Sequence, residues 1–172
     1  IEKKNPLDAL IAYAQIQNKN KALIIVGEGE LRTAIEQYVK EYKVPNVHCT
    51  GFKNQTELPL YYACADIFVL PSGSGETWGL VVNEAMCAKL PIIVSDLVGC
   101  GADLVNHGEN GFIVGTHNKK ELTERLEDLI NDPVKRAIFK KKSFEKIRGY
   151  CYEENKIAVK KALDIVTLRA MR

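Results

Sequence analysis

The most informative part of this sequence for its fold is the stretch Asp66-Ile67-Phe68-Val69-Leu70-Pro71-Ser72-Gly73-Ser74-Gly75-Glu76-Thr77-Trp78-Gly79-Leu80. Its first part, residues 66–70, is a short apolar run that a proline ends, and this pattern predicts a buried strand. A loop with three glycines follows, and a helical pattern then covers residues 80–89. The stretch therefore predicts a strand, a flexible loop and a helix in that order.

The same alternation continues on both sides of this stretch. Short apolar runs predict strands at 22–26, 47–50, 91–95 and 111–115, and apolar residues three and four apart predict helices at 6–14, 31–42, 58–65, 122–130, 134–148 and 153–170. Because strands that alternate with helices need crossover connections, we expect a mostly parallel sheet covered on both faces, with residues 22–26 buried. The fold class is therefore α/β, a Rossmann-like doubly wound parallel sheet with ligands at the carboxyl ends of its strands.

The composition fits a globular protein. The chain has 172 residues, of which 46% are hydrophobic and 27% charged, and this suits one domain or one half of a two-domain enzyme. No apolar run approaches the length of a transmembrane helix. The cysteines are five in number and lack Cys-x-x-Cys spacing, which indicates reduced thiols in a cytoplasmic protein and argues against a zinc site.

The positive charge is concentrated at the C-terminal end. Residues 133–172 hold 12 Lys and Arg against four Asp and Glu, although the whole chain has a net charge of only +2. A basic segment of this kind is either a solvated helix face or a contact for an anionic partner such as a membrane surface. We expect no nucleic-acid partner, because aromatic residues are not interleaved with the basic ones as in single-strand binders.

The glycine-rich loop is the strongest candidate for a ligand site. Glycines let a ligand approach the backbone, and the N–H groups of Gly79, Leu80 and Val81 open the predicted helix, whose dipole favours an anion. A phosphate is the natural ligand for such amides. The alternative is an ordinary strand–loop–helix connection, of which every α/β domain has several.

Two carboxylates flank this loop, Glu76 within it and Glu84 about one helical turn after Leu80. Carboxylates repel phosphate but accept hydrogen bonds from sugar hydroxyls, so amides and carboxylates together describe a site for a nucleotide sugar. The alternatives are a solvated loop charge for Glu76 and a favourable interaction with the helix dipole for Glu84.

The chain resembles the C-terminal half of the group 1 glycosyltransferases, the retaining GT-B enzymes. Pro71-Ser72 and the segment 76–86 are similar to the family motif in which two Glu are separated by seven residues. Further similarities lie at 26–32, 50–52, 61–66 and 108–112, so the resemblance covers residues 3–132. The departures are Trp78 in place of Phe, two extra residues before Glu76, and Lys89-Leu90-Pro91 in place of Gly-x-Pro.

The resemblance implies roles for individual residues. Glu76 would act in catalysis by orienting the donor sugar, and Glu84 would bind the ribose hydroxyls. The diphosphate would lie on the amides of the helix start and on a lysine, and Lys53 would lie along the base through its backbone. The full set of implied donor-binding residues is Lys4, Gly27, Lys53, Thr77, Gly79, Leu80, Val81 and Glu84.

The resemblance also implies how the chain is organised. Residues 1–150 would form the nucleotide-sugar-binding domain with its first strand truncated, and residues 151–172 a helix that packs on an absent N-terminal domain. The whole enzyme would transfer a sugar from a UDP- or GDP-linked donor, without a metal or other cofactor, to a saccharide or lipid-linked acceptor held by that domain. We expect this fragment alone to be inactive, and the enzyme to be cytoplasmic with a peripheral contact at the inner face of the membrane.

Two other functions fit the same architecture. One is a nucleotide-sugar hydrolase or epimerase, and the other is a module that binds nucleotides without catalysis. A dehydrogenase does not fit, because Arg32 stands where the dinucleotide-binding fingerprint requires Gly or Ala. The histidines at 48, 107 and 117 have no spacing typical of a metal site or a catalytic triad, so we expect them to be structural or exposed.

Overall fold

The computed structural model describes residues 2–170, and at residues 167–170 only the course of the backbone. The strands are β1 (Leu23–Ile25), β2 (Val47–Cys49), β3 (Phe68–Leu70), β4 (Ile92–Ser95) and β5 (Gly111–Val114). The helices are α1 (Pro6–Gln15), α2 (Arg32–Glu41), α3 (Leu58–Cys64), α4 (Leu80–Cys87), α5 (Gly101–Leu104), α6 (Lys119–Asn131), α7 (Pro133–Arg148) and α8 (Tyr152–Ala170). A 3₁₀ turn, η1 (Glu2–Lys4), precedes them, and neither η1 nor α5 was expected from the sequence.

All strand pairs are parallel, which confirms the predicted α/β class. They form two groups, in which β1 pairs with β2, and β4 lies between β3 and β5. The register aligns Phe68 with Ile92 and Ile92 with Gly111, so the carboxyl ends of β3, β4 and β5 lie at the same edge. This is the edge at which the loop between β3 and α4 begins.

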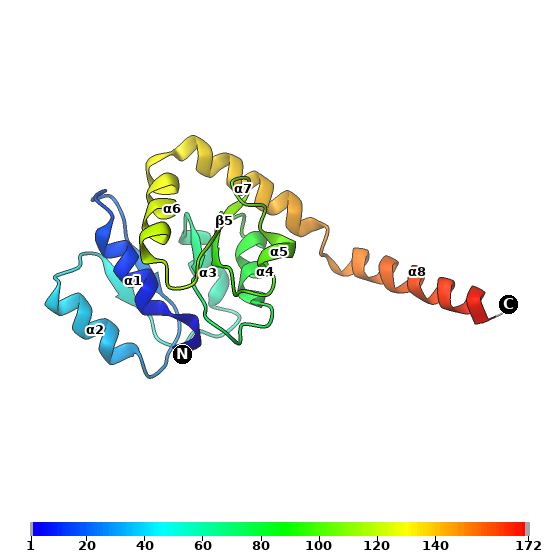
Figure 1. Ribbon diagram of the computed structural model, residues 1–172, viewed down its shortest axis with the longest axis horizontal. Helices are drawn as coiled ribbons and strands as arrows, with labels where there is room; N and C mark the ends of the chain where they lie inside the picture. The colour runs from blue at the N-terminus through cyan, green and yellow to red at the C-terminus, as the bar shows by residue number, and fades with distance from the viewer. Residues whose placement is uncertain (1, 171–172) are drawn as a thin grey trace.

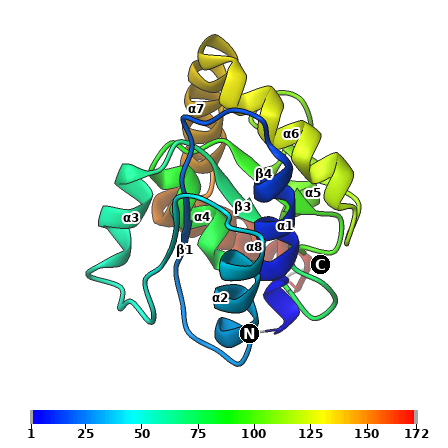
Figure 2. The same cartoon turned by 90° about the vertical axis from the view of Figure 1, so that its left-hand side faces the viewer.

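Helices cover both faces of the strands, as a doubly wound sheet requires. One buried cluster joins α1 and α6 to the strands through residues such as Leu10, Ile93 and Leu122. A second cluster joins α4, α5 and α7 to the other face through residues such as Met86 and Ile147. Figure 2 shows α1 and α6 to one side of β3 and β4, and α3 and α4 toward the other side.

The strands differ in burial, and one expectation was wrong. Every residue of β4 is buried, because this strand has a neighbour at each edge and helices on both faces. The expectation that β1 is buried on both faces is wrong, because Ile24 is 41% exposed. The reason is that Leu23 and Ile25 pack against the buried cluster that contains α1, whereas Ile24 points to the opposite face, on which its partner His48 of β2 is exposed as well.

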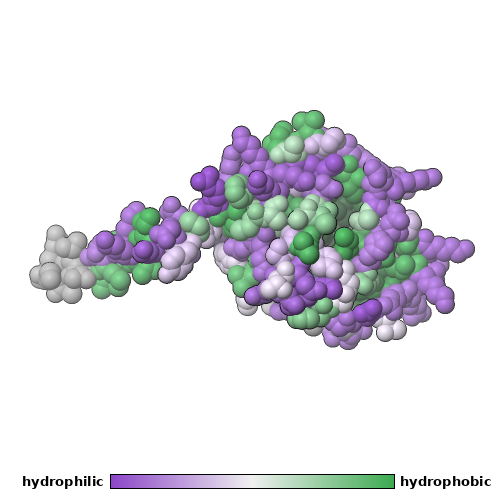
Figure 3. Space-filling view, turned by 180° about the vertical axis from the view of Figure 1, so that it is seen from behind, coloured by the Kyte–Doolittle hydropathy of each residue, from purple (hydrophilic) through white to green (hydrophobic). Residues whose placement is uncertain are grey.

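The last helix, α8, projects away from the rest of the chain (Figure 1). All side chains described on it, at residues 152–166, are exposed. Val159 is 60% exposed and Val166 is 65% exposed, and Figure 3 shows such hydrophobic residues among hydrophilic ones along this projection. No helix in the described part of the chain is both long enough and apolar enough to cross a membrane.

Candidate functional site

The loop between β3 and α4 is fixed by the neighbouring loop between β4 and α5. Gly99 N donates a hydrogen bond to Glu76 O over 3.1 Å, and Cys100 N donates to Trp78 O over 2.9 Å. Gly99 has to be a glycine for this contact, because a Cβ atom there would lie 1.9 Å from the carbonyl oxygen of Thr77. The sequence offered a Gly-Cys-Gly stretch at this position but no sign of the close approach.

The start of α4 presents free backbone donors. Gly79 has a φ of 95° and precedes the helix without a side-chain cap, whereas Asn118 caps α6. Within residues 2–170, the amides of Gly79, Leu80 and Val81 have no hydrogen-bond acceptor. Leu80 is 70% exposed and Val81 half-buried, whereas Gly79 is buried, so the helix start is open to solvent on the Leu80 side. Free amides at a helix start can bind an anion.

The Glu76 side chain is buried, being only 8% exposed, and it forms an ion pair with Lys4 at the end of η1. The hydroxyl of Ser72 donates a second hydrogen bond to the same carboxylate over 3.3 Å. The alternative interpretation of Glu76 as a solvated loop charge is therefore wrong. A buried carboxylate needs such partners because its desolvation is costly.

Residues near the N-terminus also form hydrogen bonds with the backbone of the loop between β3 and α4. Gly73 N donates to Lys3 O over 2.8 Å, and the side-chain amide of Asn5 donates to Pro71 O over 3.0 Å. Sequence analysis predicted Lys4 as a phosphate ligand but gave no role to Asn5, because the contact joins segments 66 residues apart. The loop is thus held from two sides, by the N-terminal turn and by the loop that follows β4.

Glu84 lies in the first part of α4 and is half-buried. Its Oε2 accepts a hydrogen bond of 2.8 Å from the hydroxyl of Tyr62, on α3. Burial raises the pKa of Tyr62, and the hydrogen bond to Glu84 raises it further, so this hydroxyl is a donor at neutral pH. Sequence analysis missed Tyr62 as a site residue, although it belongs to a stretch that resembles the family.

Gly27 and Lys53 lie beyond β1 and β2. Gly27 has a φ of 133°, and its N–H donates to Gly51 O over 3.0 Å, which joins the two loops. The Lys53 ammonium lies 3.2 Å from Glu57 and 5.8 Å from the centre of the Tyr61 ring. The pKa of Lys53 is raised, mainly by its hydrogen bond to Glu57 and to a smaller extent by its interaction with Tyr61. Among described residues, no hydrogen bond or ion pair links Gly27 or Lys53 to the carboxylates of Glu76 and Glu84.

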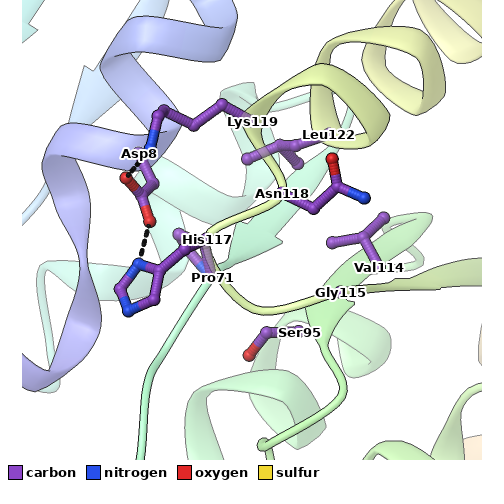
Figure 4. Close-up of a pocket in the computed structure, with 9 residues that line it drawn as sticks. All are labelled: Asp8, Pro71, Ser95, Val114, Gly115, His117, Asn118, Lys119 and Leu122. Atoms are coloured by element: carbon purple, nitrogen blue, oxygen red, sulfur yellow. Dashed lines mark hydrogen bonds and ion pairs between the residues drawn. The ribbon is translucent and has the colours of Figure 1, made fainter.

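A small pocket on the α1 and α6 side of the strand ends contains none of the predicted site residues (Figure 4). Asp8 connects its two sides, since its carboxylate lies 2.7 Å from His117 Nδ1 and 3.3 Å from Lys119 Nζ. The His117 side chain is 64% exposed, which agrees with the expectation that it is structural or exposed. The pocket is lined by Asp8, Pro71, Ser95, Val114, Gly115, His117, Asn118, Lys119 and Leu122.

The other chemically active groups do not form a second site. Cys100 is fully buried beside the loop, and burial raises the pKa of its thiol to about 11, so it is a poor nucleophile at neutral pH. In the part of the chain that the structure describes, no three His, Cys, Asp or Glu side chains are grouped as a metal site requires.

Known proteins with sequences similar to this chain are glycosyltransferases. The model of the family described as glycosyl transferases, group 1, matches residues 1–146. An uncharacterised glycosyltransferase of Methanocaldococcus jannaschii is 26% identical over 140 residues, which are 81% of this chain and 39% of that protein. The poly(ribitol-phosphate) alpha-N-acetylglucosaminyltransferase of Staphylococcus aureus is 26% identical over 147 residues, which are 82% of this chain and 29% of that protein. The chain thus spans well under half the length of these relatives.

Solved structures show the same fold. A mutant of S. aureus TarM, in complex with fondaparinux, alpha-GlcNAc-glycerol and UDP, superposes with a TM-score of 0.81 at 25% identity. The match covers 95% of this chain and 33% of that one. Since the family model covers most of the sequence and this fold agrees with it, the chain belongs to the group 1 glycosyltransferases, and its fold is that of a GT-B domain.

Proposed function

We propose that this chain is the donor-binding half of a retaining glycosyltransferase, which takes the sugar from a UDP- or GDP-linked donor. The observation that carries the proposal is the set of three free amides at the start of α4, with Glu76 before them and Glu84 after them. In this proposal the amides of Gly79, Leu80 and Val81 bind the diphosphate, and the carboxylates accept hydrogen bonds from sugar hydroxyls. UDP is present in the TarM complex, which supports a nucleotide as the ligand.

Lys4 has two anionic partners in this mechanism. It neutralises the buried Glu76 when no ligand is bound, and a diphosphate at the start of α4 offers it a second anion nearby. When the glycosidic bond breaks, negative charge develops on the departing nucleoside diphosphate, and a lysine and helix amides stabilise that charge. Glu76 then remains free to hold the donor sugar, with the hydroxyl of Ser72 as its remaining partner.

The base is proposed to lie along the backbone at Lys53, near the turn at Gly27. The support is that the Lys53 side chain is engaged by Glu57 and Tyr61, so its backbone is the part that is left for a ligand. Thr77 is also proposed to contact the donor, because it is exposed in the loop just before the start of α4. Neither contact distinguishes UDP from GDP.

An acceptor domain and an opening strand are proposed to precede this chain. Leu23 N donates to Asn46 O beside β2 and Phe68 N donates to Pro91 O beside β4, so the peptide groups of Ile24 and Val69 point to the opposite edges. The N-terminal residues already lie beside the loop that follows β3, through their contacts with Gly73 and Pro71. The proposed parallel strand comes before Glu2 and leads into the turn η1. In the common doubly wound order, that strand lies between the pair of β1 and β2 and the group of β3, β4 and β5.

Hydrogen exchange tests this strand. In the full-length protein the amides of Ile24 and Val69 should exchange slowly, whereas in the 172-residue chain alone they should exchange rapidly. Equal rates in the two proteins would contradict the proposal. The exposed side chains of α8 are proposed to pack on the same absent domain, so they should become protected together with these amides.

A contact with an anionic membrane surface is proposed for the basic C-terminal segment, residues 133–172. Basic side chains of α7 already pair with acidic groups, since Lys140 lies 3.0 Å from Asp66 and Lys142 lies 3.3 Å from Glu109. A lipid-linked acceptor would bring the enzyme to the cytoplasmic face of the membrane. Co-sedimentation of the full-length protein with vesicles should then increase with their content of anionic lipid, and no increase would contradict this contact.

Titration calorimetry of the full-length protein with UDP, GDP and ADP tests the proposed donor site. We expect one uridine or guanosine diphosphate to bind, and Glu76→Gln should lower turnover far more than nucleotide affinity. A protein that binds none of the three nucleotides would refute the site. If Glu76→Gln weakened binding and the unsubstituted enzyme showed no turnover with any acceptor, a module that only binds nucleotides would be the better description.

A further inference from the structure

The hydrogen bond between Tyr62 and Glu84 joins two helices that are separated in the sequence by a strand and the glycine-rich loop. The Tyr62 hydroxyl lies 2.8 Å from Glu84 Oε2, and both side chains are half-buried. A bond between a hydroxyl and an ionised carboxylate is among the stronger hydrogen bonds in proteins. It therefore restricts the rotation of the Glu84 side chain.

The Tyr62 ring is itself held in place by hydrophobic packing. Its centre lies 6.0 Å from that of Phe68 on β3, and both rings pack against the buried cluster around Met86. The hydroxyl is protonated at neutral pH because burial raises the pKa of this tyrosine, so it acts as a donor. The position of the donor is therefore set by the protein core rather than by solvent.

The second carboxylate oxygen of Glu84 remains available. Among the described residues, only Tyr62 donates to this side chain, and it does so to Oε2. An ionised carboxylate has about four acceptor positions, so Oε1 can accept hydrogen bonds from a ligand while Oε2 is held.

We propose that Tyr62 is a positioning residue of the nucleoside site, which holds Oε2 of Glu84 so that Oε1 accepts from the ribose hydroxyls. This inference rests on the proposed function, because it takes Glu84 as the ribose ligand. A fixed acceptor loses less conformational freedom on binding than a mobile one, and this is how Tyr62 raises nucleotide affinity. Tyr61, the preceding residue on α3, lies beside Lys53, so α3 contacts the side chains of both proposed nucleoside ligands.

Calorimetry of the full-length protein and its Tyr62→Phe variant tests the inference with two probes, UDP and 2′,3′-dideoxy-UDP. The second probe lacks the ribose hydroxyls but keeps the base and the diphosphate. Tyr62→Phe should weaken UDP binding about two- to tenfold, which is the usual cost of immobilising one side chain on binding, and leave the affinity for the dideoxy probe unchanged. Equal weakening for both probes, or weakening for neither, would overturn the inference.

The control variant is Tyr13→Phe, which removes a hydroxyl that lies 2.9 Å from Pro45 O, in a separate part of the fold. It should lower thermal stability without changing the affinity ratio of the two probes. In a Glu84→Ala background, which has no side-chain acceptor, adding Tyr62→Phe should cause no further loss of UDP affinity. A further loss there as large as the one in the unsubstituted background would also overturn the inference.

Failure of the proposed function has a different signature. If the unsubstituted protein binds none of UDP, GDP and ADP, the proposed function and this inference fall together. If it binds GDP rather than UDP, the same comparison is made with GDP and 2′,3′-dideoxy-GDP. If it binds the nucleotide and its dideoxy analogue equally, Glu84 is not a ribose ligand, and this inference falls while the proposed diphosphate site stands. If the unsubstituted protein prefers UDP and Tyr62→Phe retains that preference and the UDP affinity, only the role of Tyr62 is refuted.

Discussion

Replacing Gly99 by alanine should distort the candidate site, although Gly99 is not one of the residues proposed to bind the nucleotide. A Cβ atom at this position would lie 1.9 Å from Thr77 O, whereas carbon and carbonyl oxygen atoms rarely approach closer than about 3.3 Å. The two loops must therefore separate by more than about 1 Å. Overpacking of this kind costs about 1–3 kcal/mol, and weakening the hydrogen bond from Gly99 N to Glu76 O adds about 1 kcal/mol.

The free energy of unfolding should thus fall by about 2–4 kcal/mol in Gly99→Ala, measured by denaturant titration of the full-length protein. Nucleotide affinity should fall as well, because a displacement of this size moves the backbone around Thr77 away from its binding geometry.

Gly101→Ala is the matched control for this prediction. It lies two residues further on and is also buried, but a Cβ atom there would meet Val94 Cγ2 at an ordinary 3.5 Å. Since Gly101 begins α5, alanine should be neutral or slightly stabilising there. If the two variants had equal stability and equal UDP affinity, the reasoning about the contact between the loops would be refuted.

Three further predictions concern charge, thiols and helix capping. Lys4→Met should lower stability by about 1–3 kcal/mol, because it leaves the buried Glu76 carboxylate without its cation, and Glu76→Gln in the same chain should recover part of that loss in thermal unfolding. At pH 8, Ellman's reagent should react slowly with Cys100, whose pKa is about 11, and rapidly with the exposed thiols of Cys64, Cys87 and Cys151; rapid modification of all cysteines would contradict the burial. Asn118→Ala should cost about 1 kcal/mol, since Asn118 caps α6, and Asn118→Ser should retain most of the stability.

The fold was largely predictable because its signals are local. The helix that begins at Pro6 and the helix that begins at Leu80 lie where apolar spacing and turn residues predict them. The strands are shorter than expected, and the predicted helix 80–89 ends early, since α4 stops at Cys87. The exposure of Ile24 could not be predicted, because it depends on whether a helix covers that face of the strand.

The candidate site was predictable only as far as single motifs reach. The two carboxylates and the open helix start follow from the spacing of Glu76, Gly79 and Glu84 within one segment. The partners of these carboxylates, Lys4 and Tyr62, lie 72 and 22 residues away, and no local pattern encodes such contacts. The resemblance to the family implied a role for Lys4 but not its contact with Glu76, and it implied no role for Tyr62.

The position of Lys4 in the short turn before α1 affects how chimeric enzymes should be assembled. A recombination junction placed at the start of α1 would leave the Lys4 cation with one parent and the Glu76 carboxylate with the other. Chimeras joined upstream of Glu2 keep both charges in the same parental module, together with the contact from Lys3 O to Gly73 N. Exchange of acceptor specificity between such enzymes should therefore succeed more often when the junction precedes this turn.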